Sequence, residues 1–408
     1  MFISKWINIS FFNLFLVALL GFTLRYKIAF SLPWLDQKNV LHSHSHFAFS
    51  GWVSHILMVL LIYYLGLKLG EQIYSRYRLL LYANLITSYG MLISFILQGY
   101  AFYSISFSTL SIFVFLLFAI YYWKDLSRIS GNPVSHKWFK WALIFGVISA
   151  LGPFALAYQM VQKLADQDWY LGSVYFFLHF QYNGWFLFAG MGLLADKLEA
   201  FDGAGMKLRT AFYLFCAACV PGYFLSVLWM PFVNTIYYLL LAAVFAQLAG
   251  WVLILQVVIK NIGGIKNQFS KPGRLLFVLS ALAFTIKLIL QSGSIHPQLS
   301  QLSYGFRPII IGYLHLVLLG VTTIFILAYV TSLKLILTSK LMLGGLYLFV
   351  AGVIINELFL MIQGVAALSY KVVPHIQLLL FGASTILLAG IGILFIASLN
   401  RKPLAEKK

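Results

Sequence analysis

Three histidines that alternate with serines are the residues of this sequence best suited to chemistry. His42, His44 and His46 precede a long apolar run, and an imidazole is a costly group at membrane depth. Neutral imidazoles ligate metal ions and haem iron, and histidines also bind and release protons near neutral pH. The cluster therefore predicts a ligand site or proton-handling groups near a membrane surface. A hydrated interfacial cluster without a ligand is the alternative.

A short motif that contains the last of these histidines occurs three times. The pattern is His-x-x-x-x-Gly, separated by 133 and 136 residues, and it comprises the pairs His46 and Gly51, His179 and Gly184, and His315 and Gly320. The first two copies continue as Gly-Trp. A repeat of this period, with one histidine in each copy, predicts three similar helical units that place three imidazoles around an axis.

The composition is that of a membrane protein. The chain has 408 residues, of which 62% are hydrophobic and 9% are charged, and long apolar stretches of this kind form membrane helices. The net charge of +18 arises from basic residues in short loops, where they face anionic headgroups. We therefore expect membrane lipid, and no nucleic acid, as a partner. Cys216 and Cys219 lie inside an apolar run and are interpreted as packing residues.

The apolar runs predict an all-α membrane protein with a single domain over residues 1–408. About 20 apolar residues are needed for each crossing. This criterion predicts twelve transmembrane helices, at residues 8–30, 42–67, 78–101, 103–124, 138–163, 170–195, 207–231, 234–259, 273–295, 305–330, 341–367 and 375–398.

The distribution of lysine and arginine predicts the orientation. Of the 28 basic residues, 21 lie on the side that holds both termini, which is therefore expected to be cytoplasmic. The second, sixth and tenth helices then run inward and carry His46, His179 and His315 in the outer half of the membrane, roughly 6–15 Å deep. Because these helices are four apart, the chain is expected to form three pseudo-symmetric four-helix arcs.

This arrangement resembles subunit I of the haem–copper oxidase superfamily, which includes the nitric oxide reductases. The resemblance implies a low-spin haem held by His315 in Gly-Tyr-Leu-His-Leu and by His46, or else by His44 or His42. It also implies that His179 corresponds to a copper ligand. A possible oxidoreductase in the bacterial inner membrane, active in electron transfer or in binding or reducing O2 or NO, is the implied function. Other respiratory subunits or an electron donor are the implied partners.

The sequence departs from the superfamily at the binuclear centre. Tyr313 stands where the family has the histidine of the catalytic haem. The adjacent copper-binding histidines of the seventh helix are replaced by Phe-Cys-Ala-Ala-Cys, and Asn183 stands where some members use a tyrosine. One imidazole does not hold copper firmly. The resemblance therefore supports one haem site, and copper binding only if other residues complete the ligand set.

Several further residues have two interpretations each. Gly51 and Gly320 leave room for a porphyrin, or else serve close helix packing beside histidines that hydrogen-bond between helices. Arg307 pairs with haem propionates or extends to the interface. Lys287 and Glu357, inside apolar helices, mark a proton or ion path or form one structural pair.

A transporter is the competing class. In that case the membrane histidines and Glu357 would move protons or metal ions. Transporters usually show two-fold or inverted repeats with broken helices. The three-fold repeat of this sequence, with a histidine at a fixed place in each copy, fits that pattern less well.

Overall fold

The computed structural model consists of helices joined by turns and short loops. It describes residues 2–164, 166–230, 234–296, 306–336 and 339–399, and no strand occurs in these ranges. The helices form two compact units. The first unit contains residues 1–125, 270–277 and 323–408, and the second contains residues 126–269 and 278–322.

The first unit is made mainly from the two ends of the chain. Its helical segments are α1 (Phe2–Ala29), α2 (Gln37–Phe47), η1 (Ala48–Ser54), α3 (His55–Leu69), α4 (Ile73–Gln98), α5 (Phe102–Leu126), α16 (Ile324–Ser332), α17 (Lys340–Leu368) and α18 (Ile376–Leu399).

The second unit is made mainly from the middle of the chain. Its segments are α6 (Val134–Ser149), α7 (Leu151–Val161), α8 (Gln167–His179), η2 (Phe180–Phe186), α9 (Leu187–Leu198), α10 (Ala204–Gly222), η3 (Tyr223–Val227), α11 (Asn234–Lys260), α12 (Ile262–Gln268), most of α13 (Lys271–Gly293), α15 (Arg307–His315) and most of η4 (Leu316–Thr323).

The prediction of a multi-span helical membrane protein is confirmed. In the described part of the chain, eleven helices are long and apolar enough to cross a membrane. The described part of every predicted range coincides with helix to within a few residues; the prediction 341–367, for example, corresponds to α17. Residues 231 and 305, which end and begin two predicted ranges, lie outside the described residues. The predicted range 170–195 falls on the continuous helical stretch α8–η2–α9, which is not among the eleven. Its middle carries the polar residues Gln181 and Asn183.

Each copy of the repeated motif lies at a π-helical turn. The segments η1, η2 and η4 are π-helices, and each begins one or two residues after the motif histidine and contains the motif glycine. The five-residue offset from histidine to glycine equals the i→i+5 spacing of π-helical hydrogen bonds. Such turns are rare and often occur at functional sites. The three copies therefore share a local backbone distortion as well as a sequence pattern.

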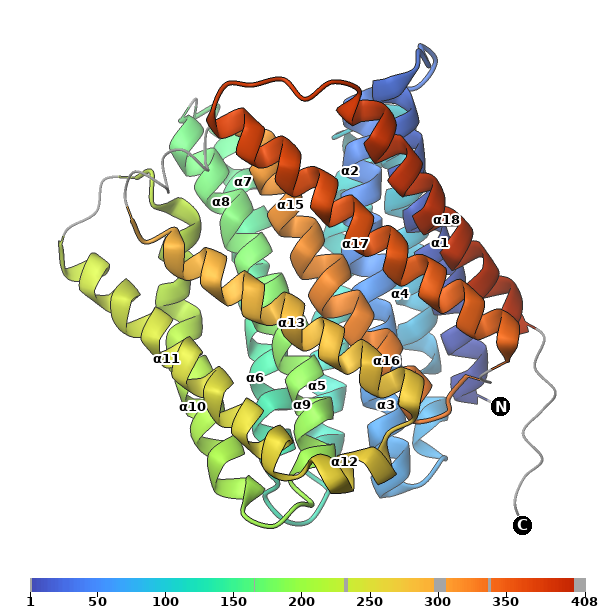
Figure 1. The fold of residues 1–408 in the computed structure, drawn as a ribbon, viewed down its shortest axis with the longest axis vertical. Coiled ribbons are helices and arrows are strands. Elements are labelled where there is room, and N and C mark those ends of the chain that lie inside the picture. Colours follow the sequence, from blue (N-terminus) through green and yellow to red (C-terminus); the bar gives the residue numbers. More distant parts are fainter. Residues whose placement is uncertain (1, 165, 231–233, 297–305, 337–338, 400–408) are drawn as a thin grey trace. The chain divides into compact units, whose positions relative to one another are not determined.

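In the first unit, α18 packs closely against both α1 and α17. The ring centroids of Phe22 and Phe381 are 5.1 Å apart, and those of Phe12 and Phe395 are 5.3 Å apart. These pairs make α1 and α18 antiparallel, so the start of α1 and the end of α18 lie at the same end of the unit (Figure 1). The backbones of α17 and α18 approach each other closely where α18 has a glycine. A Cβ added at Gly390 would lie 2.5 Å from the backbone nitrogen of Phe349 on α17.

In the second unit, α7 and α8 form a tight helical hairpin. A Cβ added at Gly152 would lie 2.6 Å from the carbonyl oxygen of Ser173, so only glycine permits this approach. The hairpin is completed by the Asp166 carboxylate, which accepts hydrogen bonds from the backbone N–H groups of Asp168 and Trp169 at 3.0 Å each. This is a helix N-cap, which satisfies backbone donors that the first turn leaves unpaired.

Candidate functional site

The histidine cluster lies on α2, which begins at an aspartate cap. The Asp36 side chain accepts a hydrogen bond from the backbone N–H of Asn39 at 2.8 Å, and α2 is helical from Gln37 onward. Because α2 is already helical at His42, the spacing of four residues puts His42 and His46 on the same face. This confirms the predicted shared face of these two histidines.

Tyr100 joins His42 and His46 into one cluster. The His46 Nε2 atom and the Tyr100 hydroxyl are 2.9 Å apart, and the His46 ring stacks on Phe95 with centroids 4.4 Å apart. The His42 ring meets the edge of Tyr100 at 4.7 Å. Tyr100 could not be predicted from the sequence, because it follows a glycine in the turn between α4 and α5 and belongs to no local pattern that points to a histidine.

His44 faces the other side of α2, as predicted. Its Nδ1–H donates to the carbonyl oxygen of Val17 on α1 at 3.1 Å. Its ring also lies against Gly21, where an added Cβ would be 3.3 Å from the His44 Cε1 atom. A carbonyl accepts only, so this bond puts the ring proton on Nδ1 and the lone pair on Nε2. The contacts with Val17 and Gly21 therefore hold the His44 ring against α1.

His315 ends α15 and has an oriented ring. Its Nδ1–H donates to the carbonyl oxygen of Ile311, one turn earlier, at 2.8 Å. The lone pair is therefore on Nε2. Histidines that ligate metals almost always donate their other ring N–H to a carbonyl or carboxylate, which fixes the tautomer and the ring plane. The His315 side chain thus has the tautomer that an iron ligand requires.

His179 has protein partners on both ring nitrogens. Its Nε2–H donates to the Cys219 carbonyl oxygen at 2.8 Å, and its Nδ1 accepts from the Asn183 side-chain amide at 3.1 Å. The side chain is 1% exposed. A copper ion could use Nδ1 only if the Asn183 amide left it, so the geometry favours a role in packing α8 against α10. Asn183 follows His179 by one turn, and this spacing could have predicted the contact.

The two motif glycines are close-packed. A Cβ added at Gly51 would lie 2.6 Å from the Phe47 ring, and one added at Gly320 would lie 3.2 Å from the Cβ of Ala283. Neighbouring side chains therefore contact both glycines, and close packing is the interpretation that these contacts favour. Arg307 begins α15 as an exposed residue two turns before His315.

The intramembrane charged residues lie in different units. Glu357 interacts electrostatically with Arg25 and accepts a hydrogen bond from the Asn356 amide at 3.1 Å, all within the first unit. Lys287 belongs to the second unit, is 2% exposed, and lies with its ammonium 5.5 Å from the centre of the Phe284 ring. Cys219 of the same unit is buried and not disulfide-bonded.

Among the residues whose positions are described, no three His, Cys, Asp or Glu side chains gather closely enough to hold a metal ion. The helices and the oriented histidines define a multi-pass helical membrane protein with candidate ligand residues in both units. Comparison with known proteins finds no family model that matches this chain and no curated protein with significant sequence similarity to it.

Proposed function

We propose that this chain is a haem-binding membrane protein that transfers electrons, with His315 as an axial ligand of a low-spin haem. The hydrogen bond that His315 Nδ1–H donates to the Ile311 carbonyl carries the proposal, because metal-ligating histidines almost always hold their other ring N–H in such a bond. The placement of all three motif histidines at π-helical turns gives further support. A bis-histidine haem supplies reversible one-electron transfer when bound.

His46 is the second proposed ligand. Its Nε2 faces the neutral hydroxyl of Tyr100. An imidazole nitrogen binds iron much more strongly than it binds a phenol hydroxyl. His44, with its lone pair on Nε2, is the alternative within the same helix. His46 and His315 belong to different units, and their pairing on one haem stays a prediction from the sequence. Arg307, exposed at the start of α15, is proposed to pair with propionates.

The donor set fits one haem better than an oxygen-reducing centre. His179 uses both ring nitrogens within the protein, and Tyr313 replaces the family's catalytic haem ligand. We therefore expect one haem per chain, substoichiometric copper and negligible oxygen consumption with a reduced donor. Metal analysis and oxygen-electrode measurements on the purified protein check this. Two haems and one copper per chain, with turnover lost in His179→Ala, would refute it.

We also propose that the chain crosses the bacterial inner membrane twelve times in three four-helix arcs. The stretch α8–η2–α9 is the twelfth crossing in this proposal. The antiparallel packing of α1 and α18 supports an even number of crossings, because the start of the first crossing and the end of the last then lie on the same side of the membrane.

The topology gives a direct expected result. A reporter that is active only outside the cytoplasm should be inactive when fused after Lys408, because 21 of the 28 basic residues lie on the side of the termini. The same reporter inserted after Leu164, between α7 and α8, should be active. Activity after Lys408 would reverse the orientation and place the motif histidines in the inner half of the membrane.

A proton- or ion-coupled transporter is the second candidate. The buried Lys287 is the observation that favours it, because ionisable groups at membrane depth often mark a transport path. A visible spectrum separates the two candidates. A colourless protein purified from haem-replete cells would favour the transporter.

A further inference from the structure

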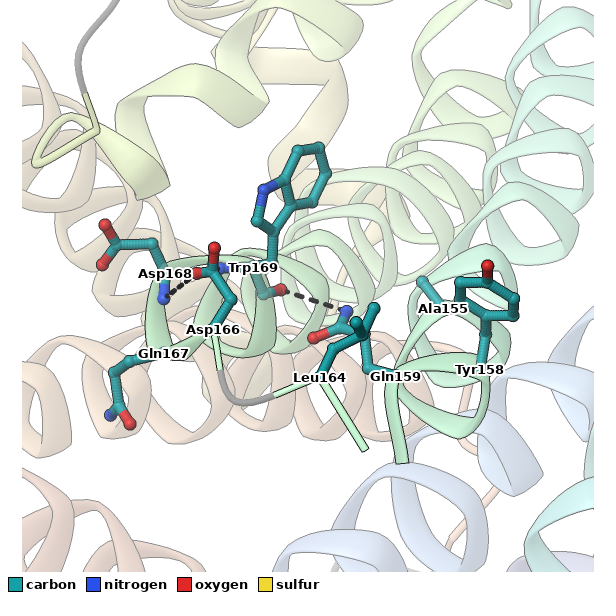
Figure 2. Close-up of a pocket in the computed structure, with 8 residues that line it drawn as sticks. All are labelled: Ala155, Tyr158, Gln159, Leu164, Asp166, Gln167, Asp168 and Trp169. Carbon is teal, nitrogen blue, oxygen red and sulfur yellow. Dashed lines mark hydrogen bonds between the residues drawn. The ribbon is translucent and has the colours of Figure 1, made fainter. Parts of the chain in front are cut away.

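A pocket of about 880 Å³ opens where α7 ends and α8 begins (Figure 2). Its lining residues all belong to the second unit and come from α7, the connecting loop and the first turn of α8: Ala155, Tyr158, Gln159, Leu164, Asp166, Gln167, Asp168 and Trp169. We propose that this pocket binds an organic ammonium group, carried by a lipid headgroup or by a free amine. The proposal does not depend on haem, because no motif histidine lines the pocket.

Two carboxylates give the pocket its charge. Asp166 uses Oδ1 to cap α8, and this leaves its second oxygen for another donor. Within the described residues, the Asp168 carboxylate has no ion pair or hydrogen bond. Lys163 belongs to the same loop but does not line the pocket. In a chain with a net charge of +18, a pocket lined by two acidic and no basic residues selects cations.

Gln159 adds a buried hydrogen-bond acceptor to the pocket. Its side chain is 7% exposed, and its Nε2 donates to the Ser173 hydroxyl at 2.9 Å and to the Trp169 carbonyl at 3.4 Å. Its Oε1 has no hydrogen-bond partner. Figure 2 shows this oxygen turned away from Tyr158, toward the side where Leu164 and Asp166 lie. A buried unpaired carbonyl is costly, and an ammonium N–H that enters the pocket is a donor of the right charge.

The aromatic residues favour an organic cation over a metal ion. Tyr158 and Trp169 are 61% and 69% exposed, and both line the pocket. Aromatic faces attract ammonium groups and are the usual elements of choline sites, whereas Ca²⁺ takes six or more oxygen ligands. Tryptophan and tyrosine concentrate at the headgroup level of membranes, where lipid ammonium groups lie.

The test uses the full chain purified in detergent and a variant that loses charge but keeps the fold. In Asp166→Asn/Asp168→Asn, asparagine still caps α8, because it is as good an N-cap as aspartate. Native mass spectrometry measures retention of phosphatidylethanolamine against phosphatidylglycerol, and calorimetry measures binding of free ethanolamine and choline. The variant should bind ammonium compounds roughly five- to tenfold more weakly. Asp202→Asn, an exposed aspartate before α10, is the matched control and should bind as the wild type does.

The mass-spectrometric and calorimetric measurements together distinguish a lipid headgroup from a free amine as the source of the ammonium group. Selective retention of phosphatidylethanolamine without binding of free ethanolamine assigns the pocket to lipid, and binding of free ethanolamine assigns it to a soluble amine. Gln159→Met removes the buried acceptor at similar volume and should also weaken binding. Equal binding by the wild type and the double variant, or binding of Ca²⁺ but of no ammonium compound, would overturn the proposal.

Discussion

His315→Ala is expected to abolish the reduced α-band of a low-spin haem. An alanine has no ligand atom, so iron loses the imidazole whose Nδ1–H is held by the Ile311 carbonyl. Five-coordinate iron is high-spin and lacks the sharp band. The measurement is a reduced-minus-oxidised spectrum of the purified protein, together with haem content by pyridine haemochrome. Of the single histidine substitutions, this one has the largest expected effect on the spectrum.

Two further variants separate ligation from general damage to the fold. His315→Met keeps a ligand atom at the same position and should retain a six-coordinate haem with a shifted spectrum and a higher reduction potential. His296→Ala changes an exposed histidine of the same unit, in the turn after α13, and should leave the spectrum unchanged. An unaltered α-band in His315→Ala, with normal yield, would contradict the assignment of His315 as a ligand.

Gly390→Val is expected to destabilise the first unit more than any conservative surface change. The added side chain would begin 2.5 Å from the backbone nitrogen and 2.7 Å from the Cα of Phe349 on α17. Backbone atoms of a membrane helix do not rotate away as a side chain does, so α17 and α18 must separate. Overpacking typically costs about 1–3 kcal/mol, and we expect a cost at the upper end of that range. Thermal unfolding in detergent, followed by tryptophan fluorescence, measures it.

The same helix supplies the control for this prediction. Gly382 also lies on α18, and no atom lies within 4 Å of a Cβ added there. Gly382→Val makes the same chemical change in the same helix and should leave the midpoint of thermal unfolding within about a degree of the wild type. Equal midpoints for Gly390→Val and Gly382→Val would mean that α17 and α18 do not pack as closely as in the structure.

The sequence by itself determined the helical segments. Hydropathy is a sum over residues that are adjacent in the chain, so an apolar run such as 341–367 predicts α17 without knowledge of its neighbours. The shared face of His42 and His46 followed in the same way, because helical periodicity relates residues four apart. The repeated His-x-x-x-x-Gly motif likewise marked three places where the backbone has the same π-helical form.

Only the tertiary structure decided the partners of these residues. Tyr100 reaches His46 across 54 residues of sequence, and the Cys219 carbonyl reaches His179 across 40. No local pattern encodes such contacts, because they depend on which helices become neighbours. The π-helical turns depend on both the local sequence and the tertiary structure. The carbonyl oxygen of Gly51, for example, accepts a hydrogen bond from the Asn13 side-chain amide of α1 at 2.6 Å. A distorted turn is stable only where a neighbouring helix satisfies its backbone groups, and that neighbour is supplied by the fold.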